Sequence, residues 1–269
     1  MARPLIALLT DFGDRDFFVG SLKAVIAGIH PEAAVVDITH NAPPFNPAAA
    51  GFILGACSGF FPQDTIFLSI VDPGVGTGRK ILLVRTPRFA FIAPDNGLLT
   101  APLEREKILE VREIAARRFF LAAGRTTFEG RDRMAPAAAW LSLGVDPAEF
   151  GPRLRTYRKL SLPRPARVTS GIRGAVLYAD HFGNLITNIP AAMLERLGDG
   201  HPAAKPVLRI AGREIRIFRT SYASAAVGRP FALINSLGLV EIAVREDSAA
   251  EALGAGPGTP VRLLAGVPR

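Results

Sequence analysis

Acidic and basic side chains follow several apolar runs of this chain, at positions where proteins often carry catalytic or ligand-binding residues. Asp11 comes directly after the first apolar run and just before Gly13, while Asp72 and Arg79 stand at either end of a loop rich in glycine and proline. In open α/β sheets, ligands gather at the carboxyl ends of the strands. We therefore expect Asp11 to accept hydrogen bonds from a ligand diol, and Asp72 and Arg79 to fold back towards each other.

These loops also admit plainer interpretations. Asp16 fits equally well as the N-cap of a helix. The loop that starts at Asp72 could be an ordinary hairpin loop, and it is not a P-loop, because Arg79 stands where the Gly-Lys pair would have to begin. Asp95-Asn96-Gly97 is a turn signal, and the acidic residues of Glu129-Gly130-Arg131-Asp132 suit the N-terminus of a helix by charge alone.

The second half of the chain offers a different set of groups. Asp180-His181-Phe182-Gly183-Asn184 places acceptors and an aromatic ring on a segment bent at glycine, and Asn235-Ser236 follows an apolar run. Such a combination suits a nucleoside or an amino acid as ligand.

The composition excludes several classes of protein. Of 269 residues, 49% are hydrophobic and 21% charged, enough for a full core, so a disordered tail is excluded. No apolar run approaches the roughly 20 residues of a membrane span, and the N-terminus lacks the layout of a signal peptide. We expect a soluble, cytoplasmic protein that does not bind membranes.

The charge balance raises the question of nucleic acid. Lys and Arg number 32 against 24 Asp and Glu, a net charge of +8, but the basic residues are scattered and not interleaved with aromatic ones. We therefore predict no nucleic-acid partner; the alternative, RNA binding, predicts strong salt dependence.

Metal and redox chemistry find little support in the sequence. Cys57 is the single cysteine, so it forms no internal disulfide, and we expect it to pack. The four histidines are widely spaced, which predicts chemistry without a metal or with one held mainly by carboxylates.

The pattern of apolar runs indicates two domains. Alternating strand and helix signals in the first half predict an α/β layered domain with a mostly parallel sheet between helices, over residues 1–150. Prolines and arginines from Asp146 to Pro165 predict a linker, assigned to residues 151–166. Short strands punctuated by Gly and Pro over residues 167–269 predict a smaller all-β barrel or sandwich. The expected elements are strands at 5–9, 34–38, 66–71, 81–84, 89–92, 175–179, 207–210, 214–218, 231–234, 240–244 and 261–264, and helices at 17–29, 48–60, 135–143, 191–197 and 248–253.

Taken together, the motifs resemble the S-adenosyl-L-methionine (SAM) hydrolases, also called SAM hydroxide adenosyltransferases, which are relatives of the fluorinase and chlorinase. The resemblance covers nearly the whole chain. The segments that carry it are Thr10-Asp11-Phe12-Gly13, Val71-Asp72-Pro73-Gly74-Val75-Gly76-Thr77 with Arg79, Ala93-Pro94-Asp95-Asn96-Gly97, Phe128 with Gly130-Arg131-Asp132, Asp180 with Phe182-Gly183-Asn184, and Asn235-Ser236 with Glu241-Ile242-Ala243.

The resemblance implies a homotrimer whose active sites lie between the N-terminal domain of one subunit and the C-terminal domain of its neighbour. SAM would bind there as substrate, with no cofactor, and water or hydroxide would displace methionine from the ribose 5′ carbon to give adenosine. Asp11 would grip the ribose hydroxyls, and Asp16 would lie near the methionine amino group. The substrate-binding residues implied, pocket walls included, are Asp11, Phe12, Asp16, Val75, Asn96, Phe128, Asp180, Phe182, Asn184 and Ser236.

Asp72 and Arg79 match two members of the Asp, Arg and His set that handles water in this family. Where the family usually reads Phe-His-Gly, this chain has Phe128-Glu129-Gly130. We expect Asp72, Arg79 and Glu129 to converge behind the 5′ carbon, with Glu129 replacing the histidine as water acceptor and base. The main alternative is a non-catalytic protein that binds SAM or adenosine, with Glu129 locked onto Arg79. A halogenase is disfavoured because two carboxylates would repel halide.

Overall fold

The structure, a computed structural model, describes residues 4–121, 124, 126–195, 197 and 206–265. The chain divides into two compact units, Met1–Ser161 and Leu162–Arg269. A search of the described residues finds no helix with the length and apolar character that crossing a membrane requires.

The first unit is built on a mixed six-stranded sheet in the order β2-β1-β3-β5-β4-β6. Its strands are β1 (Leu5–Thr10), β2 (Ala34–Thr39), β3 (Thr65–Ile70), β4 (Ile81–Arg85), β5 (Phe89–Pro94) and β6 (Glu110–Glu113). The pairs from β2 to β5 are parallel, whereas β4 runs antiparallel to both β5 and β6. The link 86–88 between β4 and β5 is too short for the crossover that a parallel pair needs.

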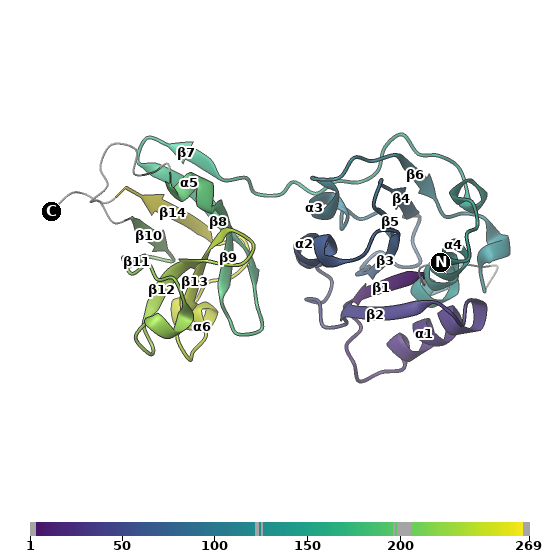
Figure 1. Cartoon of the computed structure of the whole chain (residues 1–269), viewed down its shortest axis with the longest axis horizontal. Helices are drawn as coiled ribbons and strands as arrows, with labels where there is room; N and C mark the ends of the chain where they lie inside the picture. The colour runs from purple at the N-terminus through teal and green to yellow at the C-terminus, as the bar shows by residue number, and fades with distance from the viewer. Residues whose placement is uncertain (1–3, 122–123, 125, 196, 198–205, 266–269) are drawn as a thin grey trace. The chain divides into compact units, whose positions relative to one another are not determined.

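Helices cover both faces of this sheet, as Figure 1 shows. One face packs against α1 (Phe18–Ile29) and α4 (Ala135–Ser142), the other against α2 (Pro47–Cys57) and the short α3 (Thr100–Leu103). Alternate residues of β1 point to opposite faces of the sheet. Ile6 and Leu8 pack in the core beneath α1 and α4, and Ala7 and Leu9 pack in the core beneath α2 and α3. Burial on both faces explains why the strands are apolar throughout. The predicted layered α/β arrangement is confirmed.

Much of the segment predicted as a linker is bound to the first unit. The backbone N–H of Leu154 donates to the Val111 carbonyl at 2.7 Å, and the Arg158 N–H donates to Asp95 Oδ1 at 2.7 Å. The side chain of Tyr157 packs against the core that β5 shares with α2. Residues up to about 160 therefore belong structurally to the α/β unit.

The second unit is an antiparallel, nearly closed barrel-like sheet. Its strands are β7 (Ala166–Val168), β8 (Gly171–Ala179), β9 (Leu185–Pro190), β10 (Val207–Ile210), β11 (Arg213–Ile215), β12 (Pro230–Ile234), β13 (Leu239–Val244) and β14 (Pro260–Leu264). They follow the order β11-β10-β14-β8-β9-β13-β12, with β7 on β8. Just after β11, the Ala232 N–H donates to the Ile217 carbonyl at 2.8 Å, which brings the two ends of the sheet together. The short helices α5 (Ala191–Glu195) and α6 (Ala249–Leu253) pack on this sheet, where the sequence predicted helices.

Candidate active site

Three of the predicted motifs meet at one edge of the first sheet. Asp11 directly follows β1, Asp72 lies two residues after β3, and Asn96 lies two residues after β5. Because β1, β3 and β5 are parallel neighbours, their carboxyl ends lie side by side. The Asn96 side chain ties two of the loops together, since its Nδ2 donates to the Val71 carbonyl at 2.8 Å. The sequence placed these motifs at the correct edge.

The loop between β3 and β4 brings Asp72 and Arg79 together. Arg79 Nε donates to Asp72 Oδ2 at 2.7 Å, and Nη2 also contacts that oxygen. Both side chains are more than 90% buried. Within the loop, the Gly74 N–H donates to Asp72 Oδ1 at 3.2 Å and Thr77 Oγ1 donates to the Gly74 carbonyl at 2.7 Å. The hairpin interpretation is wrong, because β5 lies between β3 and β4 in the sheet.

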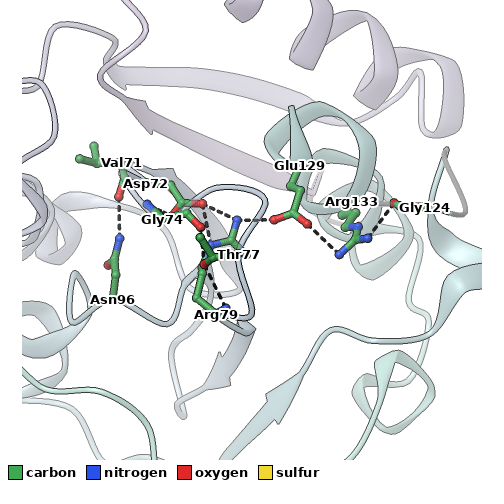
Figure 2. Close-up of polar contacts among 9 residues, drawn as sticks. All are labelled: Val71, Asp72, Gly74, Thr77, Arg79, Asn96, Gly124, Glu129 and Arg133. Atoms are coloured by element: carbon green, nitrogen blue, oxygen red, sulfur yellow. Dashed lines mark hydrogen bonds and ion pairs between the residues drawn. The ribbon is translucent and has the colours of Figure 1, made fainter. Parts of the chain in front are cut away.

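Glu129 reaches the same pair from a distant part of the chain. Its Oε2 accepts a hydrogen bond from Arg79 Nη2 at 2.5 Å, and the residue is 1% exposed. It stands immediately before η3 (Gly130–Met134), one turn of π-helix that leads into α4. Asp72, Arg79 and Glu129 thus converge, and Figure 2 shows their side chains turned towards one another; their position behind a ribose 5′ carbon stays a prediction.

A fourth charged residue, which we did not predict from the sequence, completes this group. Arg133 Nη1 lies 2.8 Å from Glu129 Oε1, and Arg133 Nη2 donates to the Gly124 carbonyl at 2.8 Å. The spacing of four residues between Glu129 and Arg133 was the available signal, because such pairs meet on the surface of a helix. In Figure 2 the chain of contacts runs from Asp72 through Arg79 and Glu129 to Arg133.

The four side chains alternate in charge. We call Asp72, Arg79, Glu129 and Arg133 the charge array; two carboxylates and two guanidinium groups make its formal charge zero. Burying a charge costs several kcal/mol unless it is paired, and here every member has an oppositely charged neighbour. The array can therefore hold fixed hydrogen-bonding groups in a largely buried place.

Aromatic rings lie beside the array. The ring centroids of Phe12 and Phe128 are 5.7 Å apart, and Phe18 contacts both rings. Gly130 packs beside these rings: a Cβ there would lie 3.1 Å from Ile70 Cδ1 and at an ordinary contact distance, 3.6 Å, from Phe12 Cζ. Phe12 and Phe128 thus form one apolar surface, which we call the aromatic wall; that it lines a pocket stays a prediction. Val75, the third predicted wall residue, is 38% exposed on its loop.

The neighbouring Asp132 is also buried and charged. Burial by itself would raise the pKa of Asp132, but the hydrogen bonds from Arg131 and the nearby guanidinium charges bring it below its ordinary value. Arg131 Nε donates to Asp132 Oδ1 at 2.7 Å, and the same guanidinium lies over the Phe128 ring. The Arg131 guanidinium thus contacts both the Asp132 carboxylate and the Phe128 ring.

Asp11 and Asp16 occupy different environments. Asp11 is partly buried, and its Oδ2 accepts from the backbone N–H of Phe45 at 2.9 Å. Asp16 is exposed, and the N-cap of α1 is Phe17, without a side-chain capping bond. The capping interpretation of Asp16 is therefore wrong, and its predicted role towards a ligand stays a prediction.

The predicted residues of the second unit lie in two places: one loop carries Asp180, Phe182 and Asn184, and the turn between β12 and β13 carries Ser236. Asp180 Oδ1 accepts from the backbone N–H groups of Phe182 and Asn184, and Asp180 Oδ2 accepts from Asn184 Nδ2 at 2.9 Å. These contacts shape a tight loop that leaves the Phe182 ring 74% exposed. Ser236 is exposed.

Beside Ser236 lies a buried carboxylate. Glu241 is 2% exposed, and it accepts from Tyr222 Oη at 2.7 Å and from Asn235 Nδ2 at 3.1 Å. Burial, together with the hydrogen bond and the negative charge of Glu241, raises the pKa of Tyr222. Asn235 Oδ1 in turn accepts from the Leu239 N–H at 3.1 Å. Glu241 thereby stabilises the turn that carries Ser236.

Among the described residues, no three His, Cys, Asp or Glu side chains gather closely enough to form a metal-binding group. The expectation of metal-free chemistry stays a prediction.

Comparisons with known proteins cover both units. Residues 6–151 match the family model of the SAM hydroxide adenosyltransferase N-terminal domain, and residues 174–262 match that of the C-terminal domain. A Thermus thermophilus relative named (R)-S-adenosyl-L-methionine hydrolase is 38% identical over 267 residues, covering 96% of this chain and 99% of the relative. A fluorinase from Actinoplanes sp. is 27% identical and covers 89% of this chain and 90% of its own. The crystal structure of an uncharacterised conserved protein from Thermotoga maritima superposes with a TM-score of 0.89 at 35% identity, covering 96% and 99% of the two chains.

Proposed function

Because this chain belongs to the SAM hydroxide adenosyltransferase family, we propose that it hydrolyses SAM at the ribose 5′ carbon to give adenosine and L-methionine. The observation that carries the proposal is the convergence of Asp72, Arg79 and Glu129 at the carboxyl edge of the first sheet. Full-length relatives named as SAM hydrolases support the choice of substrate.

The reaction requires one water molecule and no redox step. The water oxygen forms a bond to C5′, the C5′–S bond breaks, and its electron pair stays on the methionine sulfur. One proton of the water passes to a carboxylate of the charge array and then to solvent, and the other stays on the 5′ oxygen of adenosine. Arg79 orients the water, and Asp72 holds Arg79 in place and accepts a proton. Glu129 replaces the family's histidine as water acceptor and base, which its existing contacts allow because each carboxylate oxygen has more than one lone pair.

The remaining predicted residues fix the substrate. The Asp11 carboxylate binds the ribose diol, which removes rotational freedom from the reacting carbon; positioning of this kind can lower a barrier by about 7 to 11 kcal/mol. The wall of Phe12 and Phe128, with Val75, excludes bulk water, which favours a reaction in which a hydroxide and a sulfonium cancel their charges. Asp16 and Asn96 complete this side of the pocket, while Asp180, Phe182, Asn184 and Ser236 bind the methionine and adenine parts.

We further propose the trimer that the family resemblance implies, with each site shared between neighbouring subunits. Phe182, which is 74% exposed on the Asp180–Asn184 loop, is available for contact with a neighbouring subunit or its ligand. Light scattering of the purified protein tests the trimer. The cytoplasmic location stays a prediction, which cell fractionation tests.

The experiment for the proposed reaction is incubation with SAM in oxygen-18 water, followed by mass analysis of the nucleoside. Adenosine labelled at its 5′ oxygen is the expected product. Unlabelled adenosine, or another nucleoside, would contradict attack by water at C5′. The same incubation with added chloride or fluoride tests the halogenase alternative, for which a halogenated nucleoside would have to form.

One observation favours a second candidate, a non-catalytic protein that binds SAM or adenosine. Both Glu129 oxygens already contact an arginine, and the residue is almost fully buried, so the array could be a closed structural unit. Calorimetry combined with product analysis separates the two functions. Heat of SAM binding without any release of methionine would support the binding protein.

A further inference from the structure

Arg133 is held on several sides within the first unit. Its Nη1 faces Glu129 Oε1, its Nη2 donates to the Gly124 carbonyl, and its guanidinium lies over the Phe120 ring at 5.2 Å from the centroid. The side chain is 20% exposed, whereas surface arginines such as Arg118 are 61% exposed. Figure 2 shows the guanidinium directed at Glu129 from the side opposite Arg79. The arginine is thus aimed at a residue of the proposed site.

The charge array depends on this arginine. Arg79 Nη2 donates to both Asp72 and Glu129, so without Arg133 two buried carboxylates would share one guanidinium. A carboxylate with a single strong partner turns towards that partner. Glu129 would then compete with Asp72 for Arg79 and displace the guanidinium that orients water.

We propose that Arg133 is a positioning residue for the hydrolysis, which holds Glu129 at the position where Arg79 stays shared with Asp72. The inference rests on the proposed function and assigns a role to a residue that does not touch the substrate. Because Arg133 acts through the charge of Glu129, its contribution disappears when that charge is removed. An arginine that affects turnover through contacts other than Glu129 would contribute equally with or without that charge, and one that only stabilises the fold would change the melting temperature and leave kcat of the folded protein unchanged.

The experiment is a double-mutant cycle on the full chain. The variants are Arg133→Met, Arg133→Lys, Glu129→Gln and the double variant Glu129→Gln with Arg133→Met. Arg112→Met is the matched control, because Arg112 is 19% exposed and likewise pairs with one carboxylate, Glu110 at 2.6 Å, and one backbone carbonyl, that of Gly151 at 3.1 Å. Methionine release gives kcat and KM for SAM, and thermal melting checks that each variant is folded.

We expect Arg133→Met to lower kcat by about 10- to 100-fold, the equivalent of one hydrogen bond to a charged group, with KM changed by less than about threefold. Arg133→Lys keeps the charge and should recover most of the lost kcat, and Arg112→Met should leave kcat unchanged. In the Glu129→Gln background, Arg133→Met should cost less than about threefold in kcat.

Several results would overturn the inference. An equal loss of kcat from Arg133→Met in both backgrounds would assign Arg133 a structural role, and so would an unchanged kcat in the wild-type background. If Arg133→Met does not fold, Arg133→Gln alone and in the Glu129→Gln background carries the test, with the same requirement of unequal effects on kcat. Absence of methionine release by the wild-type protein would remove the proposed function, and with it the inference. An active wild type with an Arg133→Met variant of the same kcat would remove the inference alone.

Discussion

Replacement of Arg79 gives the sharpest test of the charge array, because this side chain contacts both carboxylates. Arg79→Met leaves Asp72 and Glu129 buried close together, with Arg133 as the only remaining cation of the array. Removing one partner of a buried ion pair typically costs about 3 to 5 kcal/mol in the free energy of unfolding. Lysine supplies a charge but no planar fork, so we expect Arg79→Lys to lose about half as much.

The measurement can be confined to the first unit. Trp140, the single tryptophan, lies in α4 with its ring centroid 6.1 Å from that of Phe119, so its fluorescence reports unfolding of this unit. With a urea dependence of a few kcal/mol per molar, the Arg79→Met midpoint should fall by roughly 1 to 2 M. Release of methionine should slow by about 100-fold or more, as when a positioned donor is removed from other active sites.

Arg85→Met is the control for this test. Arg85 also pairs with a carboxylate of the first unit, but its side chain is 45% exposed, and such surface pairs contribute about 1 kcal/mol or less. An Arg79→Met protein that unfolds at the wild-type urea concentration would show that the array contributes no stability. If it also turned over SAM within twofold of the wild-type rate, our account of the site would be wrong.

Three further predictions concern groups outside the array. Burial raises the pKa of the Cys57 thiol to about 11, so a thiol reagent at pH 8 should label it only after urea is added. The pKa of Tyr222 is raised in the folded protein, so as the pH increases the unfolded chain loses this proton first. The contribution of Tyr222 to the free energy of unfolding is therefore fully present below about pH 10 and is lost above it. Tyr222→Phe should reduce this alkaline loss of stability, measured by urea titrations at increasing pH. Gly183 has φ +80°, and a Cβ there would lie 2.2 Å from Ser248 Oγ, so Gly183→Ala should lower the melting temperature of the second unit in calorimetry, whereas an unchanged temperature would contradict this close contact.

The sequence predicted most elements of the fold because burial leaves a direct pattern. β3, β4 and β5 are apolar since both their faces are covered, and each lies within a residue or two of its expected range. β6, with the sequence Glu-Val-Arg-Glu, escaped prediction, because an edge strand that alternates charged and apolar residues is short and weakly marked. The antiparallel direction of β4 was recoverable from the short link 86–88 and was missed.

The candidate site was predictable only in part. Asp72, Arg79 and Glu129 were named from their motifs, and they meet. The loop after β3 carries Asp72 and Arg79, and the segment just before η3 brings Glu129 to them. Arg133 carries no motif, and its role depends on the turn of π-helix that starts after Glu129. Contacts of this kind need the coordinates, since residue spacing shows that two side chains can meet without showing that they do.

The zero charge of the array bears directly on a sulfonium substrate. An excess of carboxylate would stabilise the positive sulfonium of bound SAM more than the transition state, in which that charge is already being cancelled, and so would raise the barrier to reaction. An excess of guanidinium would repel the substrate. With Glu129 but without Arg133, the array would carry an excess of carboxylate. The two residues are therefore coupled through charge as well as through contact. Losing Arg133 alone should therefore slow turnover more than it strengthens SAM binding. Removing the Glu129 charge as well returns the formal charge of the array to zero, so in that background the loss of Arg133 should slow turnover little further.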